Sequence, residues 1–249
     1  MRIDEHMKCS FFAVYDGHGG ADCSKYLAGN LHKVLRDKLV DKFDGVKTQN
    51  NMAQTFNNII KDTFLQADND LAQKVHNPKC GSTAAWVLIV GDRLYAANVG
   101  DSRAILSSKG QAIELTWDQN LKRDDEKKRI IENEGLDVGK VHGQLMVTRA
   151  FGDFKFKFTN EFKILDYKTL LVTPEVREHR IDPFNDEFVV IASDGLFDEM
   201  LSQEVVEFVL DRFNEKPDNI LKALMDKLFE DREGKDDITV ILVMLQRNY

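Results

Sequence analysis

Apolar residues recur at helical spacing in two early segments of the chain. One face of the first segment steps by three or four positions, at Leu27, Leu31, Val34, Leu35 and Leu39. The second segment repeats the pattern at Ala53, Phe56, Ile60, Phe64, Ala67, Leu71 and Val75. Because positions three and four apart share one face of an α-helix, both segments are predicted to be helices that bury one side.

The hydrophobic period then changes to that of strands. Four short runs follow one another, AAWVLIV, RLYAANV, RAILSS and QAIELT. The pairs Gly91-Asp92 and Gly100-Asp101 connect the first three runs, and two-residue Gly-Asp connections are typical of β-hairpins. We therefore expect an antiparallel sheet. Further strands are predicted up to Val147 and then at residues 170–172, 176–181, 188–192 and 238–245.

Three more helices are expected later in the chain. The pair Asp124-Asp125 can cap a helix that runs to about Asn133. Ser202 can cap a second helix at residues 205–213, and a third covers residues 220–229. Antiparallel strands placed between early and late helix pairs predict one sheet packed on another, with helices outside both.

Size and charge limit the possible functions. The 249 residues are 43% hydrophobic and 31% charged, which is enough for a sizeable core under an ordinary soluble surface. A net charge of −8 and a pI near 5.3 argue against nucleic acid as the main partner. No stretch has the composition of a linker, so one domain over residues 1–249 is the simplest expectation, with a monomer as the default.

Cysteine usage and the termini bear on location. Cys9, Cys23 and Cys80 are scattered and lack C-x-x-C spacing, so neither a disulfide framework nor a zinc site is expected. No apolar stretch approaches the roughly 20 residues of a membrane helix. The N-terminal MRIDEHMK lacks the apolar region of a signal peptide. These features favour the cytoplasm or nucleus, without membrane association.

Several aspartates stand where a short apolar run meets a turn. Asp16 and His18 follow the run at residues 11–15, Asp194 follows residues 188–192, and Asp236 precedes residues 238–243. Carboxylates at strand ends have a rigid backbone behind them. Several drawn from distant parts of the chain would form an oxygen-rich cage for hard divalent cations such as Mg²⁺ or Mn²⁺.

Each of these residues also has a purely structural explanation. Asp and Gly are favoured in turns for backbone reasons, so Asp16-Gly17 and Gly100-Asp101 taken singly are typical of turns. His18 taken singly is typical of a loop histidine. Arg149 lies beside a predicted core strand, where a structural ion pair and a substrate contact are equally expected.

Six segments in sequence order resemble the metal-dependent protein phosphatases of type 2C: FFAVYDGHGG, CGSTAAWVLIV, YAANVGDSRAIL, LMVTRAFGD, VVIASDGLFD and KDDITVILV. The resemblance extends from residue 11 to residue 245. It implies an α+β fold, a four-layer α-β-β-α sandwich of two mainly antiparallel sheets flanked by helices. It also implies hydrolysis of phosphoserine and phosphothreonine in proteins with two, possibly three, Mg²⁺ or Mn²⁺ ions.

The resemblance also implies roles for individual residues. The metal ligands would be Asp16 as the bridging carboxylate, the Gly17 carbonyl, Asp194 and Asp236 at the first metal, and Asp101 and Asp198 at a weaker third ion. Paired ions of this kind lower the pKa of a bridging water. His18 would be the general acid that protonates the departing seryl or threonyl oxygen. Asp237 stands where the family usually has Asn, which adds a charge beside the ligands.

A segment rich in Phe and Lys, residues 154–169, falls where the family carries a variable flap beside the active site. Its lysines are expected to steer a phosphorylated substrate. The N-terminus departs from the family, which has a preceding strand with a phosphate-binding Arg and a Glu-Asp pair. Here Arg2, Asp4 and Glu5 have the right chemistry at the wrong spacing. A tight hairpin around residues 8–10 is one way to bring Asp4 or Glu5 back alongside Asp16.

Three functions are therefore open. The first is a metal-dependent serine/threonine protein phosphatase, seen here with its first strand missing or shortened. The second is a catalytically impaired pseudophosphatase that acts as a binding or regulatory scaffold. The third is a hydrolase of the same fold that acts on a small phosphorylated molecule.

Overall fold

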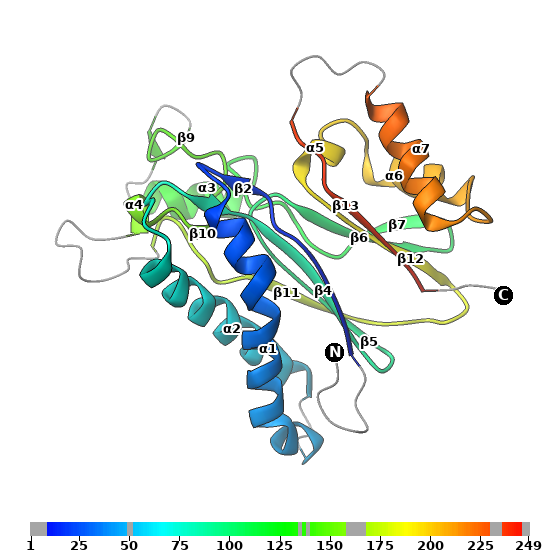
Figure 1. The fold of residues 1–249 in the computed structure, drawn as a ribbon, viewed down its shortest axis with the longest axis horizontal. Helices are drawn as coiled ribbons and strands as arrows, with labels where there is room; N and C mark the ends of the chain where they lie inside the picture. Colours follow the sequence, from blue (N-terminus) through cyan, green and yellow to red (C-terminus); the bar gives the residue numbers. More distant parts are fainter. Residues whose placement is uncertain are drawn as a thin grey trace.

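Two four-stranded sheets form the centre of the protein (Figure 1). The computed structural model describes residues 9–48, 52–133, 136–137, 140–157, 168–229 and 236–245. The first sheet has, in order, β1 (Cys9–Val14), β4 (Ala84–Val90), β5 (Arg93–Val99) and β11 (Glu175–Arg180). The second has β13 (Val240–Met244), β12 (Asp186–Ala192), β6 (Arg103–Ser108) and β7 (Gln111–Glu114). All pairings within them are antiparallel.

Helices cover the outer face of each sheet (Figure 1). The first sheet is covered by α1 (Asp22–Thr48) and α2 (Met52–Lys74), and the second by α6 (Ser202–Leu210) and α7 (Pro217–Phe229). Shorter helices are α3 (Asp124–Glu132), α4 (Phe154–Lys157) and α5 (Asp194–Phe197). The expected four-layer sandwich is confirmed. Among the described residues, no helix has the length and apolarity needed to cross a bilayer.

The apolar strands are buried on both faces. In β4, Trp86 and Leu88 pack against the α1/α2 layer, whereas Ala85 and Val87 face the other sheet. Because successive side chains of a strand point to opposite faces, a strand between two apolar layers needs a continuous apolar run. This requirement explains why AAWVLIV shows no polar alternation.

The early helices bury the face that their periodicity predicts. Leu27 and Leu35 of α1 and Phe56 and Phe64 of α2 are fully or almost fully buried. The stripe on α2 is less buried at its start, since Ala53 is exposed.

Two short ladders complete the strand inventory of the described residues. One joins β2 (Gly17–His18), β3 (Gly81–Ser82) and β10 (Phe151–Gly152), with β3 in the middle. The other joins β8 (Leu136–Asp137) and β9 (Lys140–Val141). The first ladder brings together three segments that are far apart in sequence, next to the start of α1.

One of the two predicted hairpins is wrong. Gly91, with φ of +60°, turns β4 back onto β5 as expected. The Gly100-Asp101 turn instead carries the chain from the first sheet to the second, because β5 and β6 belong to different sheets. At Gly100, φ is +92° and a Cβ would lie 2.7 Å from Cγ2 of Thr83, so the crossing requires glycine.

Several element boundaries also differ from expectation. Arg123, rather than an aspartate, is the N-cap of α3, and it has no side-chain capping bond. Ser202 is the first residue of α6 rather than its cap, and its hydroxyl donates to Glu114 instead. Residues 170–172 form only an isolated bridge, between Leu171 and Arg149.

Candidate metal and catalytic site

The predicted site residues converge on one cavity and its neighbour. A cavity of about 290 Å³ is lined by six of them: Asp16, Gly17, His18, Asp101, Asp194 and Asp236. An adjoining cavity of about 390 Å³ is lined by the seventh, Asp198, and shares Asp101 and Asp194 with the first. The structure thus brings together residues from distant parts of the chain.

Asp16 lies between β1 and β2 and is held by Thr83. The Thr83 N–H donates to the Asp16 carbonyl at 2.8 Å, and the Asp16 N–H donates to the Thr83 hydroxyl at 3.3 Å. At the next position, a Cβ on Gly17 would lie 2.5 Å from Oγ of Ser24 in α1. Only glycine lets the backbone pass this close to the helix, and that backbone includes the predicted carbonyl ligand.

The second group of carboxylates is built at the end of β12. Asp194 is the first residue of α5, and Asp198 follows it by one helical turn, with its N–H donating to the Asp194 carbonyl. The Thr239 N–H donates to the Ser193 hydroxyl at 3.0 Å, which ties the start of β13 to this turn. Asp236, a few residues before β13, reaches the same cavity as Asp194.

The cavity gathers negative charge without a lysine or arginine to balance it. Burial, followed by the charges of Asp101 and Asp16, raises the pKa of Asp194 to about 7. Burial and Asp118 raise the pKa of Asp101 to about 6, and burial and Asp236 raise that of Asp16. Among the described residues, no lysine or arginine lines this cavity.

This environment fits a hard divalent cation. The lining groups include carboxylates and a backbone carbonyl, which are the donors that Mg²⁺ and Mn²⁺ prefer. Oδ1 of Asp194 is buried and has no hydrogen-bond partner in the part of the chain that the structure describes. A buried carboxylate oxygen without a donor is costly, and a bound cation would remove that cost.

His18 has a partner that the sequence analysis missed. Nε2 of His18 lies 2.6 Å from Oδ2 of Asp153, a fully buried carboxylate. A Cβ on Gly81, which pairs with His18 in the short ladder, would be within 2.3 Å of both side chains. Burial lowers the pKa of His18, but the Asp153 hydrogen bond and the charges of Asp153 and Asp101 outweigh burial, so the pKa is raised.

Asp153 itself is held in an unusual backbone conformation. Its φ of +52° is in the left-handed region, which a non-glycine residue rarely adopts. The preceding Gly152 N–H donates to Asp68 of α2 at 2.8 Å. Asp68 also binds the Lys157 ammonium at 2.9 Å, and Lys157 donates in turn to the Ala150 carbonyl at 2.7 Å. This buried ion pair closes the turn that presents Asp153 to His18.

The same ion pair corrects the prediction for the flap segment. Lys157 is fully buried, so it cannot steer a substrate. Lys155 and Lys168 are exposed, and the Lys155 ammonium lies 3.3 Å from Gln144. Residues 158–167, which include the fourth lysine of the segment, lie outside the described residues.

Most of the N-terminal segment that would supply the additional ligands lies outside the described residues. Arg2, Asp4 and Glu5 are not among the described residues. Cys9 and Ser10, part of the segment where a hairpin is one of the expected options, belong to β1 and pair with β4. Both residues are therefore paired in an antiparallel strand rather than placed in a turn.

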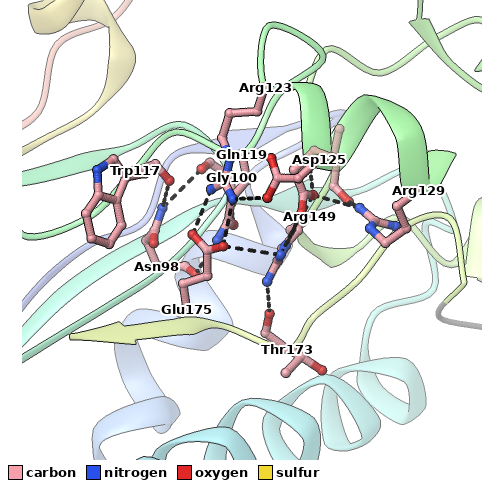
Figure 2. A network of polar contacts seen from close by, with 12 residues as sticks. Asn98, Gly100, Trp117, Gln119, Arg123, Asp125, Arg129, Arg149, Thr173 and Glu175 are labelled. Carbon is pink, nitrogen blue, oxygen red and sulfur yellow. Dashed lines mark hydrogen bonds and ion pairs between the residues drawn. The ribbon is translucent and has the colours of Figure 1, made fainter.

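Arg149 is a structural residue. Its guanidinium donates to Glu126 at 2.6 Å, to the Thr173 carbonyl at 2.9 Å and to Glu175 at 3.4 Å. Figure 2 shows it in a network between α3 and the start of β11, in which Arg123 binds Glu175 at 2.7 Å. Of the two roles considered for Arg149, the ion pair is therefore the one observed.

This network also supports Asp101. Gln119 accepts from the Gly100 N–H and donates its own N–H to the Gly100 carbonyl, both at 2.9 Å (Figure 2). Thr148 in turn donates its N–H to the Gln119 carbonyl. The crossing between the sheets is thereby clamped, and the residue after Gly100 is held at the cavity.

A second acidic group lies inside this network. One carboxylate oxygen each of Asp125, Glu126 and Glu175 can be chosen within 4.8 Å of one another, which is a metal-like spacing. Arginine side chains already bind all three. Despite its burial, Glu126 has a pKa lowered to about 2 by Arg149 and Thr148. Arginine side chains therefore neutralise these three carboxylates, and no cation is required there.

Comparisons with known proteins identify relatives of this chain. The family model of Protein phosphatase 2C matches residues 2–236. A protein phosphatase 2C homolog of Schizosaccharomyces pombe is 39% identical over 97% of this chain, and a probable protein phosphatase 2C of Caenorhabditis elegans is 36% identical over 98%. The chain spans 60% and 68% of the lengths of these two relatives.

Solved structures show the same fold. A serine-threonine phosphatase 2C from Toxoplasma gondii superposes with a TM-score of 0.74 at 20% identity, covering 95% of this chain and 84% of that one. A sex-determining protein of Caenorhabditis elegans gives a TM-score of 0.76 at 24% identity, covering 96% of this chain and 57% of that one. At these identities the likeness concerns the fold.

Proposed function

The chain belongs to the protein phosphatase 2C family, and we propose that it hydrolyses phosphoserine and phosphothreonine esters of proteins with divalent metal ions. One observation carries the proposal. Carboxylates from four distant segments meet in a cavity that no described lysine or arginine lines, and a histidine with a buried carboxylate partner lines the same cavity. The carboxylates can bind the cations that would neutralise the charge on a phosphoryl group, and the histidine can protonate an alkoxide leaving group.

The carboxylates would hold the ions. Asp16, Asp194 and Asp236 would bind the catalytic metals with the Gly17 carbonyl, and Asp101 and Asp198 would bind a third ion. Mg²⁺ or Mn²⁺ bound there would lower the pKa of water and neutralise phosphoryl charge. The rigid strand ends fix the carboxylates before substrate arrives, so little reorganisation is needed.

His18 would supply the proton. In the charged form it donates to the oxygen of the departing serine or threonine, and its raised pKa increases the protonated fraction near neutral pH. Asp153 holds the imidazole ring in place through its 2.6 Å contact with Nε2. The other ring nitrogen, Nδ1, is then the one left for the substrate.

The two other functions make different demands. A pseudophosphatase scaffold would not need the His18–Asp153 pair, which requires both a glycine at position 81 and a left-handed aspartate. Retention of that pair favours an enzyme. A hydrolase of small phosphorylated molecules would share all these residues, so a panel of phosphopeptides and phosphorylated metabolites separates it from a protein phosphatase.

The test is turnover of a phosphothreonine peptide with Mn²⁺, with Mg²⁺ and with chelator. We expect metal-dependent release of phosphate that an Asp194→Ala variant lacks. Absence of turnover, with metal binding intact by calorimetry, would favour the scaffold. Turnover of metabolites but not of peptides would favour the small-molecule hydrolase.

A further inference from the structure

Two further hollows accompany the 290 Å³ cavity that contains Asp16 and Asp194, which we call the metal cavity. Together the three hollows are called the groove. The metal cavity and the adjoining cavity share Met146 in addition to two aspartates. The adjoining cavity then shares Asp118, Asn120 and Lys122 with a third hollow of about 320 Å³ that reaches Trp117. The three hollows therefore lie side by side, and residues between 117 and 123 line the two outer ones.

Most of the charge along this groove is already neutralised. Arg103 binds Asp118 through two bonds, at 2.9 and 2.7 Å. Arg123 is bound to Glu175 and Asp125. The aspartates of the inner end would be neutralised by the metal ions of the proposed function.

Lys122 is the exception. Its side chain is exposed, it lines both outer hollows, and it forms no ion pair with the residues that the structure describes. Its backbone is nevertheless fixed, because its N–H donates to Oδ1 of Asn120 at 3.0 Å. An exposed ammonium group on a fixed backbone, without an anion among the described residues, is available to a ligand.

Two exposed apolar side chains line the same groove. Met146 is 60% exposed at the wall between the inner hollows, and Trp117 is 47% exposed at the outer end. The Arg177 guanidinium lies 5.2 Å from the centre of the Trp117 ring. Asn98 donates to the Trp117 carbonyl at 2.8 Å, as Figure 2 shows. Exposed aromatic and thioether side chains along a groove are typical of peptide-binding surfaces.

From the adjacency of the hollows and the charge of Lys122, which no described residue pairs, we propose that this groove binds the substrate polypeptide and that Lys122 binds an anionic group on it. The inference rests on the proposed function. The phosphoresidue enters the metal cavity, neighbouring side chains contact Met146 and Trp117, and a carboxylate or second phosphoryl group a few residues away meets Lys122. The preferred substrates are therefore phosphorylated sites in acidic segments.

The experiment compares two phosphothreonine peptides on the Mn²⁺-loaded full chain. One has neutral residues around the phosphothreonine, and the other has aspartates and glutamates in their place. The readout is the ratio of kcat/KM for the acidic peptide to that for the neutral one, because a ratio cancels any general loss of activity. A second acidic peptide, with phosphoserine in place of the flanking acids, compares the two anionic groups.

We expect the ratio to be about five in the unaltered protein, the size of one exposed ion pair. Lys122→Ala should reduce it to about one, and Lys122→Glu should reduce it below one. Lys127→Ala is the matched control, since Lys127 is an exposed lysine on α3 that lines none of the three hollows. It should leave the ratio as it is.

A ratio that neither Lys122 variant changes would overturn the inference, as would an equal change in Lys127→Ala. Failure of the proposed function looks different, because neither peptide would then be turned over. In that case the same peptides, labelled with fluorescein, report binding by anisotropy. A preference for the acidic peptide that depends on Lys122 would support the groove, and its absence would overturn it.

Discussion

The protein contains two groups of acidic side chains that resemble each other in composition and differ in what neutralises them. In the metal cavity, Asp16, Asp101 and Asp194 lie together, and their pKa values are raised. In the network of Figure 2, Asp125 and Glu126 are bound by arginines, and their pKa values are lowered to about 2. The charged form of a carboxylate is therefore disfavoured in one region of the fold and favoured in the other.

The difference shows that close carboxylates do not by themselves make a metal site. The network has a metal-like spacing, with oxygens within 4.8 Å of one another, yet Arg123, Arg129 and Arg149 complete it. The cavity has no described lysine or arginine in its lining and contains a buried carboxylate oxygen without a donor, on Asp194. Uncompensated charge, rather than proximity, identifies the position for a cation.

Removing one carboxylate from the cavity should produce the largest effect. Asp194→Asn should reduce turnover of a phosphothreonine peptide roughly a thousandfold, because a metal ligand and its charge are lost. In chelator the same variant should melt at a higher temperature than the unaltered protein, because a buried like-charge repulsion is removed. Mn²⁺ should then raise the melting temperature of the unaltered protein alone. Equal stabilisation of both by Mn²⁺ would locate the ion elsewhere.

Removing one carboxylate from the network should have the opposite effect on stability. Glu126→Gln leaves two arginines without their shared anion, and we expect a loss of about 3 kcal/mol in the free energy of unfolding in urea. The matched control is Glu132→Gln on the same helix, whose exposed pair with Lys128 should contribute under about 0.5 kcal/mol. Similar losses in both variants would contradict the structural role of the network.

Asp153 is an intermediate case, a buried carboxylate balanced by a histidine. Asp153→Asn should lower kcat on a phosphothreonine peptide about a hundredfold, because His18 would lose the partner that holds it as an acid. Hydrolysis of p-nitrophenyl phosphate should fall much less, since its phenolate leaves without protonation. An equal loss on both substrates would mean that Asp153 acts on the metal site instead.

The smallest effects should appear in the pH dependence of stability without metal. The pKa of Glu126 is lowered to about 2, so its contribution is complete above about pH 4.5 and is lost as pH falls towards 2. The pKa of Asp194 is raised to about 7, so stability is lost as pH rises from about 4 through 7. Unfolding free energies at several pH values should therefore separate Glu126→Gln from the unaltered protein above pH 4.5, and Asp194→Asn near pH 7. Slopes of the same sign would contradict the comparison.

Much of the architecture and site could be predicted from local patterns. The helical stripes that contain Leu31 in α1 and Ile60 in α2 are buried because a 3.6-residue period defines one face. The aspartates of the cavity stand at strand ends, and a strand end fixes the direction in which the chain leaves the sheet. Each of these features depends on residues close together in sequence.

The partners of the charged residues depend on distant contacts instead. Asp153 meets His18 across 135 positions, and Lys157 is neutralised by Asp68 across 89. No local period links such pairs, so a flap lysine that the sequence predicts at the surface is buried. The Gly100-Asp101 turn shows the same limit, because a hairpin and a crossing between sheets use the same two residues.

The sequence by itself therefore determined where most helices and strands lie, and that aspartates end strands, because these features depend on short-range periodicity and turn chemistry. Only the tertiary structure decided which carboxylates are left without a cation, because charge compensation is a property of packed neighbours. Asp194 and Glu126 are both acidic residues in the first turn of a helix, and their surroundings alone separate a candidate metal ligand from a structural anchor.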